Sequence, residues 1–171
     1  LQVETVESFS EEVSTKIDRF AWEDTNVNHT SMLFQLLQLL LQVTKTESGT
    51  LIVVNESGNV IDGVQVFKGK TVSPSMEKLL EISQNGLAGW VVRNKQPALV
   101  DNTSSDNRWL QRPWEVEKQE SKSALSVPVK AGNIIGSITL VRPKENRFSI
   151  KDLELVTNMT SGMEPTLNHI D

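Results

Sequence analysis

Residues 86–101 read GLAGWVVRNKQPALVD, and this stretch decides the fold of the chain more than any other. It opens with glycines on either side of Leu-Ala, turns at a polar run, and resumes after Pro97 as an apolar segment that stops at Asp101. The pattern predicts a short, tightly packed helix over 87–93 that leads into a buried strand. Because a long polar loop and two more strands follow, we expect a sheet with a lidded cavity.

The loop that follows, residues 102–121, is long for a connection inside a compact domain. Loops of this kind often cover a site or bind a partner. Trp109 and Trp114 lie in it, next to Arg108 and Arg112. Tryptophans on loops fill pockets, but they also anchor a loop on the sheet below it, and both roles stay open at this point.

Residues 29–45 are the strongest predicted helix. Apolar residues cover most of its circumference and leave only a narrow face of glutamines. Such a helix has more apolar surface than one sheet face covers, so we expect it to pack on the sheet and against a second helix. That second helix is either the C-terminal helix or the same helix of another subunit. The residues assigned to a dimer contact are Met32, Leu33, Leu36, Leu37, Leu40 and Val43.

Segments rich in β-branched residues predict strands on both sides of the opening stretch. Glycine-containing turns join them into an early and a late hairpin. We also expect Gly49 to end the leucine-rich helix in a left-handed conformation, and Ser73 to cap a helix over 73–83. The predicted strands span 50–54, 60–67, 98–100, 122–130 and 134–141.

Serine followed three residues later by an acid predicts helix starts near both ends of the chain. Ser8 with Glu11 predicts an N-terminal helix, which is either a signalling helix from a preceding domain or a helix that folds back onto this one. Ser149 with Asp152 predicts a C-terminal helix that ends or kinks at Pro165.

The order of these elements predicts an α+β fold with a central antiparallel sheet of five or six strands. The terminal helices are expected on one face, and the short helices and the long loop on the other. Covering on both faces explains why the strands are not cleanly amphipathic. We divide the chain into a helical linker (1–28), a folded domain (29–165) and a frayed tail (166–171). Because the chain starts at Leu1, we expect it to be a segment of a longer protein.

The composition excludes several classes of function. The 171 residues carry a net charge of −5 without a dense Lys/Arg patch, which argues against nucleic acid or an anionic membrane as partner. The absence of cysteine excludes disulfides, thiolate metal sites and cysteine nucleophiles. His29 and His169 lie far apart, so neither a zinc or haem site nor a Ser/His/Asp triad can be assembled from them. The longest uncharged run, 30–44, is too short to cross a membrane as a helix.

Several motifs, taken in order, resemble the GAF domain family. The family pattern is a Gly-x-x-Gly helix, a Gln-Pro turn, a strand ending in Asp, an Asp-x-Arg-aromatic loop, Ser-Ala-Leu-x-Val-Pro, and Phe-Ser-x-x-Asp-Leu at the last helix. The resemblance covers about Ser31 to Met163, and a PAS domain, which has a related sheet, is the main competing fold. The matching residues are Gly86/Gly89, Asn94/Gln96/Pro97, Asp101, Asp106/Arg108/Trp109, Ser123 to Pro128, and Phe148/Ser149/Asp152/Leu153/Leu155.

The resemblance implies a cytoplasmic, non-enzymatic regulatory module of a larger bacterial signalling protein. Such a module binds a small molecule, forms a homodimer through its terminal helices, or does both, and so relays a signal. The alternative is a purely structural dimerisation and relay domain without a ligand. The lack of cysteine excludes a covalently attached bilin and the cysteine-dependent methionine sulfoxide reductase chemistry of GAF relatives, and the position of the histidines argues against haem. No cofactor is expected.

If a ligand binds, we expect it between the sheet and the 87–93 helix, under the 102–121 loop. An alternative role for Asp101 and Arg108 is to pair with each other and brace the loop. The candidate ligand contacts are Trp90, Asp101, Arg108, Trp109, Trp114 and Ser123.

Overall fold

A six-stranded antiparallel sheet forms the centre of the chain, in the order β3-β2-β1-β6-β5-β4. The computed structural model describes the backbone of residues 25–110 and 121–168 and the side chains of 28–110 and 121–161. The predicted N-terminal helix therefore lies outside the described residues. The strands are β1 (Ser48–Val54), β2 (Val60–Phe67), β3 (Lys70–Val72), β4 (Ala98–Val100), β5 (Lys122–Ala131) and β6 (Ile134–Pro143). The predicted fold class is confirmed.

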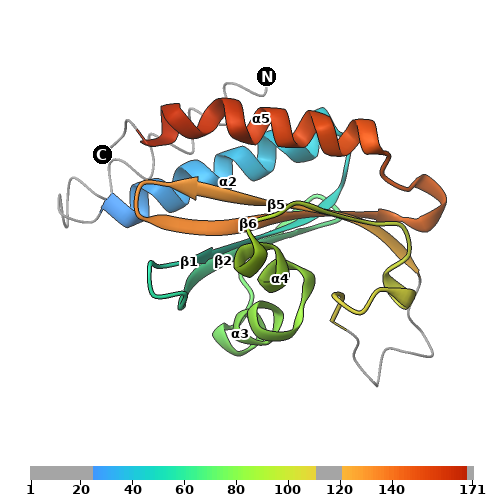
Figure 1. The fold of residues 1–171 in the computed structure, drawn as a ribbon, viewed down its shortest axis with the longest axis horizontal. Helices are drawn as coiled ribbons and strands as arrows, with labels where there is room; N and C mark the ends of the chain where they lie inside the picture. Colours follow the sequence, from blue (N-terminus) through green and yellow to red (C-terminus); the bar gives the residue numbers. More distant parts are fainter. Residues whose placement is uncertain (1–24, 111–120, 169–171) are drawn as a thin grey trace.

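Helices cover both faces of this sheet (Figure 1). On one face, α2 (Thr25–Val43) and α5 (Ile150–Asn168) lie side by side in opposite directions, and α2 packs on the central strands. On the other face lie α3 (Met76–Asn85) and α4 (Leu87–Asn94), which pack against each other. Short 3₁₀ turns, η1 (Thr103–Ser105) and η2 (Lys144–Asn146), lie in the connections. Among the described helices, none is long and apolar enough to cross a membrane.

The sheet separates two cores because successive side chains of a strand point to opposite faces. Leu51 and Val53 of β1 join the large core under α2 and α5, whereas Ile52 and Val54 join a smaller one under α3 and α4. Burying one leucine or valine stabilises the fold by about 1.5–3 kcal/mol. The leucines of α2 that are fully buried in the large core are Leu33, Leu36, Leu37 and Leu40.

Two glycines permit close contacts between backbones, one between α3 and α4 and one between β6 and β1. A Cβ atom on Gly89 would lie 1.7 Å from the Ser83 carbonyl oxygen, so α4 packs against the end of α3 without any side chain between them. A Cβ atom on Gly136 would lie 2.1 Å from the Ile52 carbonyl oxygen. The backbones of β6 and β1 therefore approach closely at Gly136.

The end of α2 differs from the prediction. Lys45, with φ of 54°, takes the left-handed conformation that was expected of Gly49. Gly49 lies inside β1, where a Cβ atom would be 2.9 Å from the Thr139 carbonyl oxygen and 3.1 Å from Leu37. The prediction was wrong because the chain reverses direction before Gly49, which is needed for close packing and not for a turn.

Two predicted helix boundaries lie elsewhere in the structure, and a third is confirmed. The N-cap of α3 is Ser75 and not Ser73, and its Oγ accepts a hydrogen bond from the Lys78 N–H at 3.1 Å. The capping box at the start of α5 is confirmed: the Asp152 N–H donates to Ser149 Oγ at 3.2 Å, and the Ser149 N–H donates to Asp152 Oδ2 at 2.7 Å. The helix then continues through Pro165 to Asn168, so it does not end at the proline.

Candidate functional site

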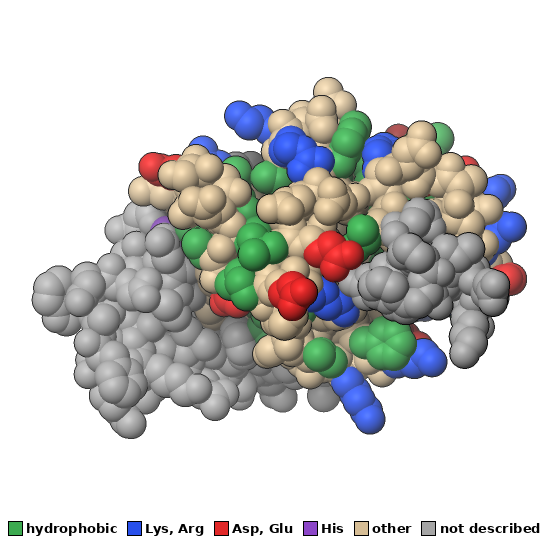
Figure 2. Space-filling model, turned by 90° about the horizontal axis from the view of Figure 1, so that it is seen from below, with side chains coloured by type: hydrophobic (Ala, Val, Ile, Leu, Met, Phe, Trp, Pro, Cys, Tyr) green, Lys and Arg blue, Asp and Glu red, His purple; other side chains and the backbone are tan. Residues whose placement is uncertain are grey.

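A cavity of about 360 Å³ lies between the sheet and the α3–α4 pair. Strands β1, β2 and β6 supply its floor, and α3 with the first turn of α4 supplies one wall. The segment at Trp109 and Leu110 and the start of β5 complete the lining. The volume is at the lower end of the range for small-molecule pockets. Figure 2 shows this side of the molecule, where hydrophobic, acidic and basic side chains mix.

The floor carries a row of polar side chains that crosses four strands. Gln65 of β2 pairs with Thr50 of β1, Thr50 pairs with Thr139 of β6, and Thr139 pairs with Ser126 of β5. The hydroxyl oxygens of Ser126 and Thr139 are 2.9 Å apart and share a hydrogen bond. Gln65, Thr50 and Thr139 line the cavity. Polar side chains are thus concentrated where the strands border the cavity, whereas the opposite face of the same strands is apolar.

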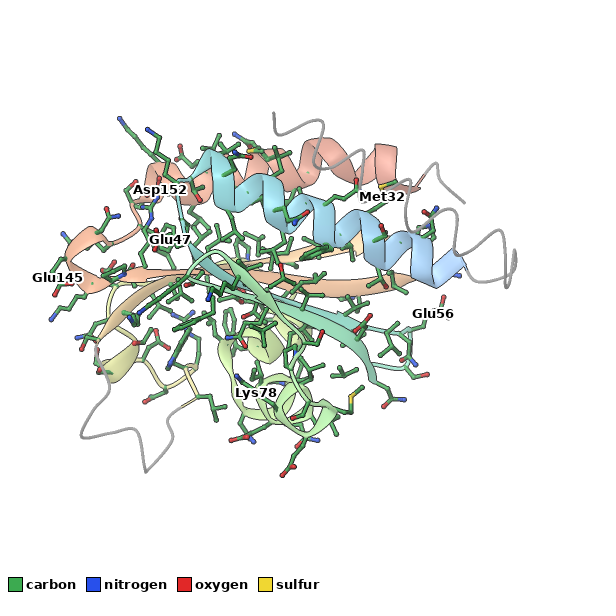
Figure 3. All side chains as sticks on the ribbon, turned by 180° about the vertical axis from the view of Figure 1, so that it is seen from behind. Met32, Glu47, Glu56, Lys78, Glu145 and Asp152 are labelled. Carbon is green, nitrogen blue, oxygen red and sulfur yellow. The ribbon has the colours of Figure 1, made fainter. Side chains whose placement is uncertain are left out.

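The wall contributed by α3 brings a cation to the cavity. Lys78 is partly buried, and its Nζ donates a hydrogen bond to Gln65 Oε1 at 3.2 Å. Figure 3 shows Lys78 with α3 on one side of the sheet and Met32 and Asp152 with α2 and α5 on the other. Around Lys78 the lining is mainly apolar, with Ile82 of α3 and Leu87 of α4 among its members.

An ion pair holds the segment that ends at Trp109. The Arg108 guanidinium donates to Asp106 in a bidentate manner, from Nε to Oδ1 at 3.0 Å and from Nη2 to Oδ2 at 2.7 Å. These hydrogen bonds lower the pKa of Asp106 and raise the pKa of Arg108. The guanidinium also stacks on the Trp90 ring, 4.9 Å from its centre. The Asp106–Arg108 ion pair, stacked on Trp90, therefore holds this segment against α4 and positions Trp109 at the cavity.

The predicted ligand contacts fall in different places. Trp109 lines the cavity. Trp90 packs beside it against a separate cluster of buried residues from α4, β4 and β5, and carries Arg108 on its ring. Because Arg108 binds Asp106, the suggested pair between Arg108 and Asp101 is not formed. Asp101 is exposed and does not line the cavity.

Ser123, another predicted contact, does not line the cavity. Ser123 is fully buried: its Oγ donates to the Val100 carbonyl oxygen at 3.1 Å and accepts from the Phe148 N–H at 3.0 Å. Its hydroxyl thereby joins β4, β5 and the start of α5. Trp114 lies outside the described residues.

The residues predicted for a dimer contact divide into two groups. Leu33, Leu36, Leu37 and Leu40 are fully buried in the core of their own chain, and Met32 is partly buried against it. Val43, at the end of α2, is 42% exposed and is the member of the set most open to a second copy.

Sequence reasoning missed the residues that give the cavity its polarity, namely Thr50, Gln65, Lys78 and Thr139. The available signal was the presence of threonine and glutamine inside otherwise apolar strands. That signal does not say which polar residues meet, because their juxtaposition depends on strand register. In the sequence, Lys78 cannot be distinguished from a solvated surface lysine, because its place at the cavity depends on the position of α3.

The described residues contain no group of three or more His, Asp and Glu side chains placed to hold a metal ion. His29 is buried in α2, on the opposite side of the sheet from the cavity. The titratable side chains that line the cavity in the described part of the chain are Lys78 and Lys122.

Comparison with known proteins settles the family. The sequence profile of the GAF domain matches residues 28–168. The chain belongs to the GAF domain family. This places it in the family that the sequence motifs resemble and decides against a PAS domain. No curated protein sequence matches this GAF domain.

Solved structures agree with that fold. A GAF domain/HD domain protein from Geobacter sulfurreducens superposes with a TM-score of 0.56 at 15% identity, over 84% of this chain and 94% of that one. A type II free methionine-R-sulfoxide reductase from Thermoplasma acidophilum gives 0.53 at 18% identity, over 83% and 94%. Residues 122 to 287 of a methyl-accepting chemotaxis protein give 0.50 at 12% identity, over 94% and 98%. At these identities the likeness shows the fold alone.

Proposed function

We propose that this GAF domain is a non-enzymatic sensory module that binds a small molecule in the cavity between the sheet and α3–α4. The observation that carries the proposal is the lining itself, in which a row of polar side chains faces a mainly apolar wall. Small-molecule sites are mostly apolar with a few polar groups that orient the ligand. GAF domains generally serve as regulatory modules, and the match to a chemotaxis protein agrees with that role.

The strands of the cavity floor offer a route from ligand to helices. Thr139 of β6 lines the cavity, while its neighbours Ile138 and Leu140 point into the core under α2 and α5. A shift of β6 on ligand binding therefore acts directly on the packing of both helices. We propose that α2 and α5 pass this change to the rest of the signalling protein.

The lining gives little support to an enzyme. Acid–base catalysis requires titratable groups with suitable pKa values next to the substrate. In the described part of the chain, lysines alone supply such groups to the cavity. The methionine sulfoxide reductase with this fold is a relevant relative, but the present chain contains no cysteine to support that family's cysteine-dependent chemistry.

Filling the cavity tests the proposal. Thr50 lies in the middle of the floor, and Thr50→Phe places a large side chain in the ligand volume while keeping a residue that strands favour. The matched control is Thr71→Phe on the exposed edge strand β3. A library of small metabolites is screened by thermal unfolding against the wild type and both variants. Compounds that raise the melting temperature of the wild type and of Thr71→Phe, but not of Thr50→Phe, are expected. A library without such compounds contradicts the proposal.

Exposed apolar side chains favour dimerisation as a second function. Val43 of α2 and Ile150 and Leu155 of α5 are 42%, 67% and 41% exposed. They lie at the same end of the helical layer, because Arg142 contacts both Thr44 at the end of α2 and Asp152 at the start of α5. A second copy packed on this surface would remove them from water.

A further inference from the structure

The charges around the cavity are of one sign. Lys78 and Lys122 line it, and no aspartate or glutamate of the described residues does. Lys78 is the better defined of the two, since its ammonium group donates to the neutral Oε1 of Gln65. An amide oxygen satisfies one of the three donors of an ammonium group and leaves its positive charge uncompensated. The polar end of the cavity is therefore suited to an anion.

The acidic residues of α3 lie outside this site. Glu77 is exposed and Glu81 is partly buried, and neither lines the cavity. Acidic side chains are visible on the outer surface of this face in Figure 2. Charges outside the cavity act through water and are weakened by salt, whereas the partly buried Lys78 in the cavity wall acts at short range.

The neighbours of Lys78 supply hydrogen-bond donors. With its Oε1 bound to Lys78, Gln65 directs its amide nitrogen elsewhere, and Thr50 and Thr139 add hydroxyl groups to the same row. An amide nitrogen and hydroxyl groups all donate to anionic oxygens. Opposite this row the wall is apolar at Leu87 and Trp109. A fitting ligand has a charged end and an apolar body.

We infer that the cavity selects a small organic anion, whose carboxylate or phosphate group is held by Lys78 and the Gln65–Thr50–Thr139 row and whose apolar body packs on Leu87 and Trp109. This inference rests on the proposed function, since it names the class of ligand for the same cavity. A neutral isostere lacks the charge-assisted hydrogen bond, and a cation is repelled by Lys78.

Four probes with one phenyl ring and different end groups test the inference: phenylacetate, phenyl phosphate, 2-phenylethanol and 2-phenylethylamine. Their dissociation constants for the purified chain are measured by NMR titration at pH 7. At least one anionic probe is expected to bind about tenfold or more tightly than the alcohol, and the amine to bind more weakly than the alcohol. The ratio between phenylacetate and phenyl phosphate identifies which anionic group the site prefers.

Substitution of Lys78 tests whether the positive charge of this side chain, and not the shape of the cavity, determines the affinity for anions. Lys78→Met removes the charge but keeps an unbranched side chain of nearly the same length. It is expected to reduce the affinity of the anionic probe by about tenfold or more while leaving that of the alcohol unchanged. The matched control is Lys130→Met, at an exposed lysine near the β5–β6 hairpin, which leaves both affinities unchanged. Unchanged binding of the alcohol also shows that the Lys78→Met protein is folded.

Equal affinity for anionic and neutral probes, or equal effects of the two lysine substitutions, overturns the inference but leaves the cavity as a ligand site. Anion binding that survives Thr50→Phe overturns it as well, because the anion then binds elsewhere. If no probe binds but library compounds do, the inference fails and the proposed function stands. If neither probes nor library compounds bind, both fail.

Discussion

At the scale of single residues, the pair of Asp106 and Arg108 gives the molecule a defined response to pH. The two side chains are 19% and 29% exposed, so water weakens the pair without removing it. Arg108 lowers the pKa of Asp106 below its ordinary value of 3.8. The folded chain thus binds fewer protons here than the unfolded chain, and the pair's contribution to stability is complete above pH 3.8 and is lost as the pH falls through the lowered pKa.

We therefore expect Asp106→Asn to reduce the free energy of unfolding by about 0.5–1 kcal/mol at pH 7 and by progressively less below pH 4. Urea denaturation at pH 7, 5, 3 and 2 measures how much less stable the variant is than the wild type at pH 7 and how this difference shrinks at lower pH. Asp101→Asn, at an exposed carboxylate in the same loop region, is the control and leaves stability at pH 7 unchanged within about 0.5 kcal/mol. A deficit that stays constant down to pH 2 would contradict the assigned cause.

The same scale shows what the sequence could and could not predict about the site. Trp109 was identified because a tryptophan on a long loop needs a surface to cover, and it lines the cavity. Lys78 and Gln65 were not identified, because they are 13 residues apart and meet only when α3 packs over β2. Residue type predicts the need for burial, but the meeting of two polar groups depends on the packing of whole elements.

At the scale of elements, Arg142 joins the ends of the two helices on one face. It extends from β6, donates from Nη2 to the Thr44 carbonyl oxygen, and donates from Nη1 to Asp152 Oδ2 at 3.4 Å. Its guanidinium also lies 4.3 Å from the centre of the Phe148 ring. The carbonyl groups at a helix C-terminus have no partner within the helix, so Arg142 satisfies one that follows α2 and pairs with the first turn of α5.

Arg142→Met is expected to lower the free energy of unfolding by about 2 kcal/mol, because Asp152 loses its ion pair and the Thr44 carbonyl keeps only the long hydrogen bond from Thr46 Oγ1, at 3.4 Å. Hydrogen exchange should accelerate most at the end of α2 and the start of α5. Arg147→Met, at an exposed arginine in the following loop, provides the control and should change stability by less than about 0.5 kcal/mol. Similar losses for both substitutions would mean that the contacts of Arg142 do not stabilise the fold.

Local chemistry also explains which elements could be predicted. The Ser149–Asp152 capping box is a local signal, and the structure forms it. Strand β3 was missed because Lys68-Gly69-Lys70 looks like the end of a strand. In the structure Lys68 and Gly69 have φ of 49° and 83°, the combination of a two-residue hairpin turn that reverses the chain into β3. A non-glycine residue with positive φ at the first turn position gives no clear signal in the sequence.

At the scale of the whole molecule, the sheet borders the cavity on one face and the large apolar core on the other. Two of the three strands of the cavity floor, β1 and β6, are also the central strands of the sheet. They are therefore in contact with both layers of helices, and neither layer can shift without affecting them. A partner bound to the exposed apolar residues at the end of the helical layer would contact α2 and α5 directly.

Association through the helical layer is expected to depend on Leu155. If two copies pack through the end of α2 and the start of α5, then Leu155→Glu places a charge in a dehydrated contact and should shift a concentration-dependent dimer to monomer. Val72→Glu is a matched control, since Val72 is 45% exposed, close to the 41% of Leu155, but lies on edge strand β3 and not on the helical layer. Sedimentation velocity from about 1 to 100 μM, a range in which dimers with micromolar dissociation constants become populated, compares both variants with the wild type.

Thermal unfolding verifies that each variant is folded. A wild type that stays monomeric throughout, or a dimer that Val72→Glu disrupts as much as Leu155→Glu, would rule out this surface, and signal relay would then depend on the cavity and the sheet of a single chain.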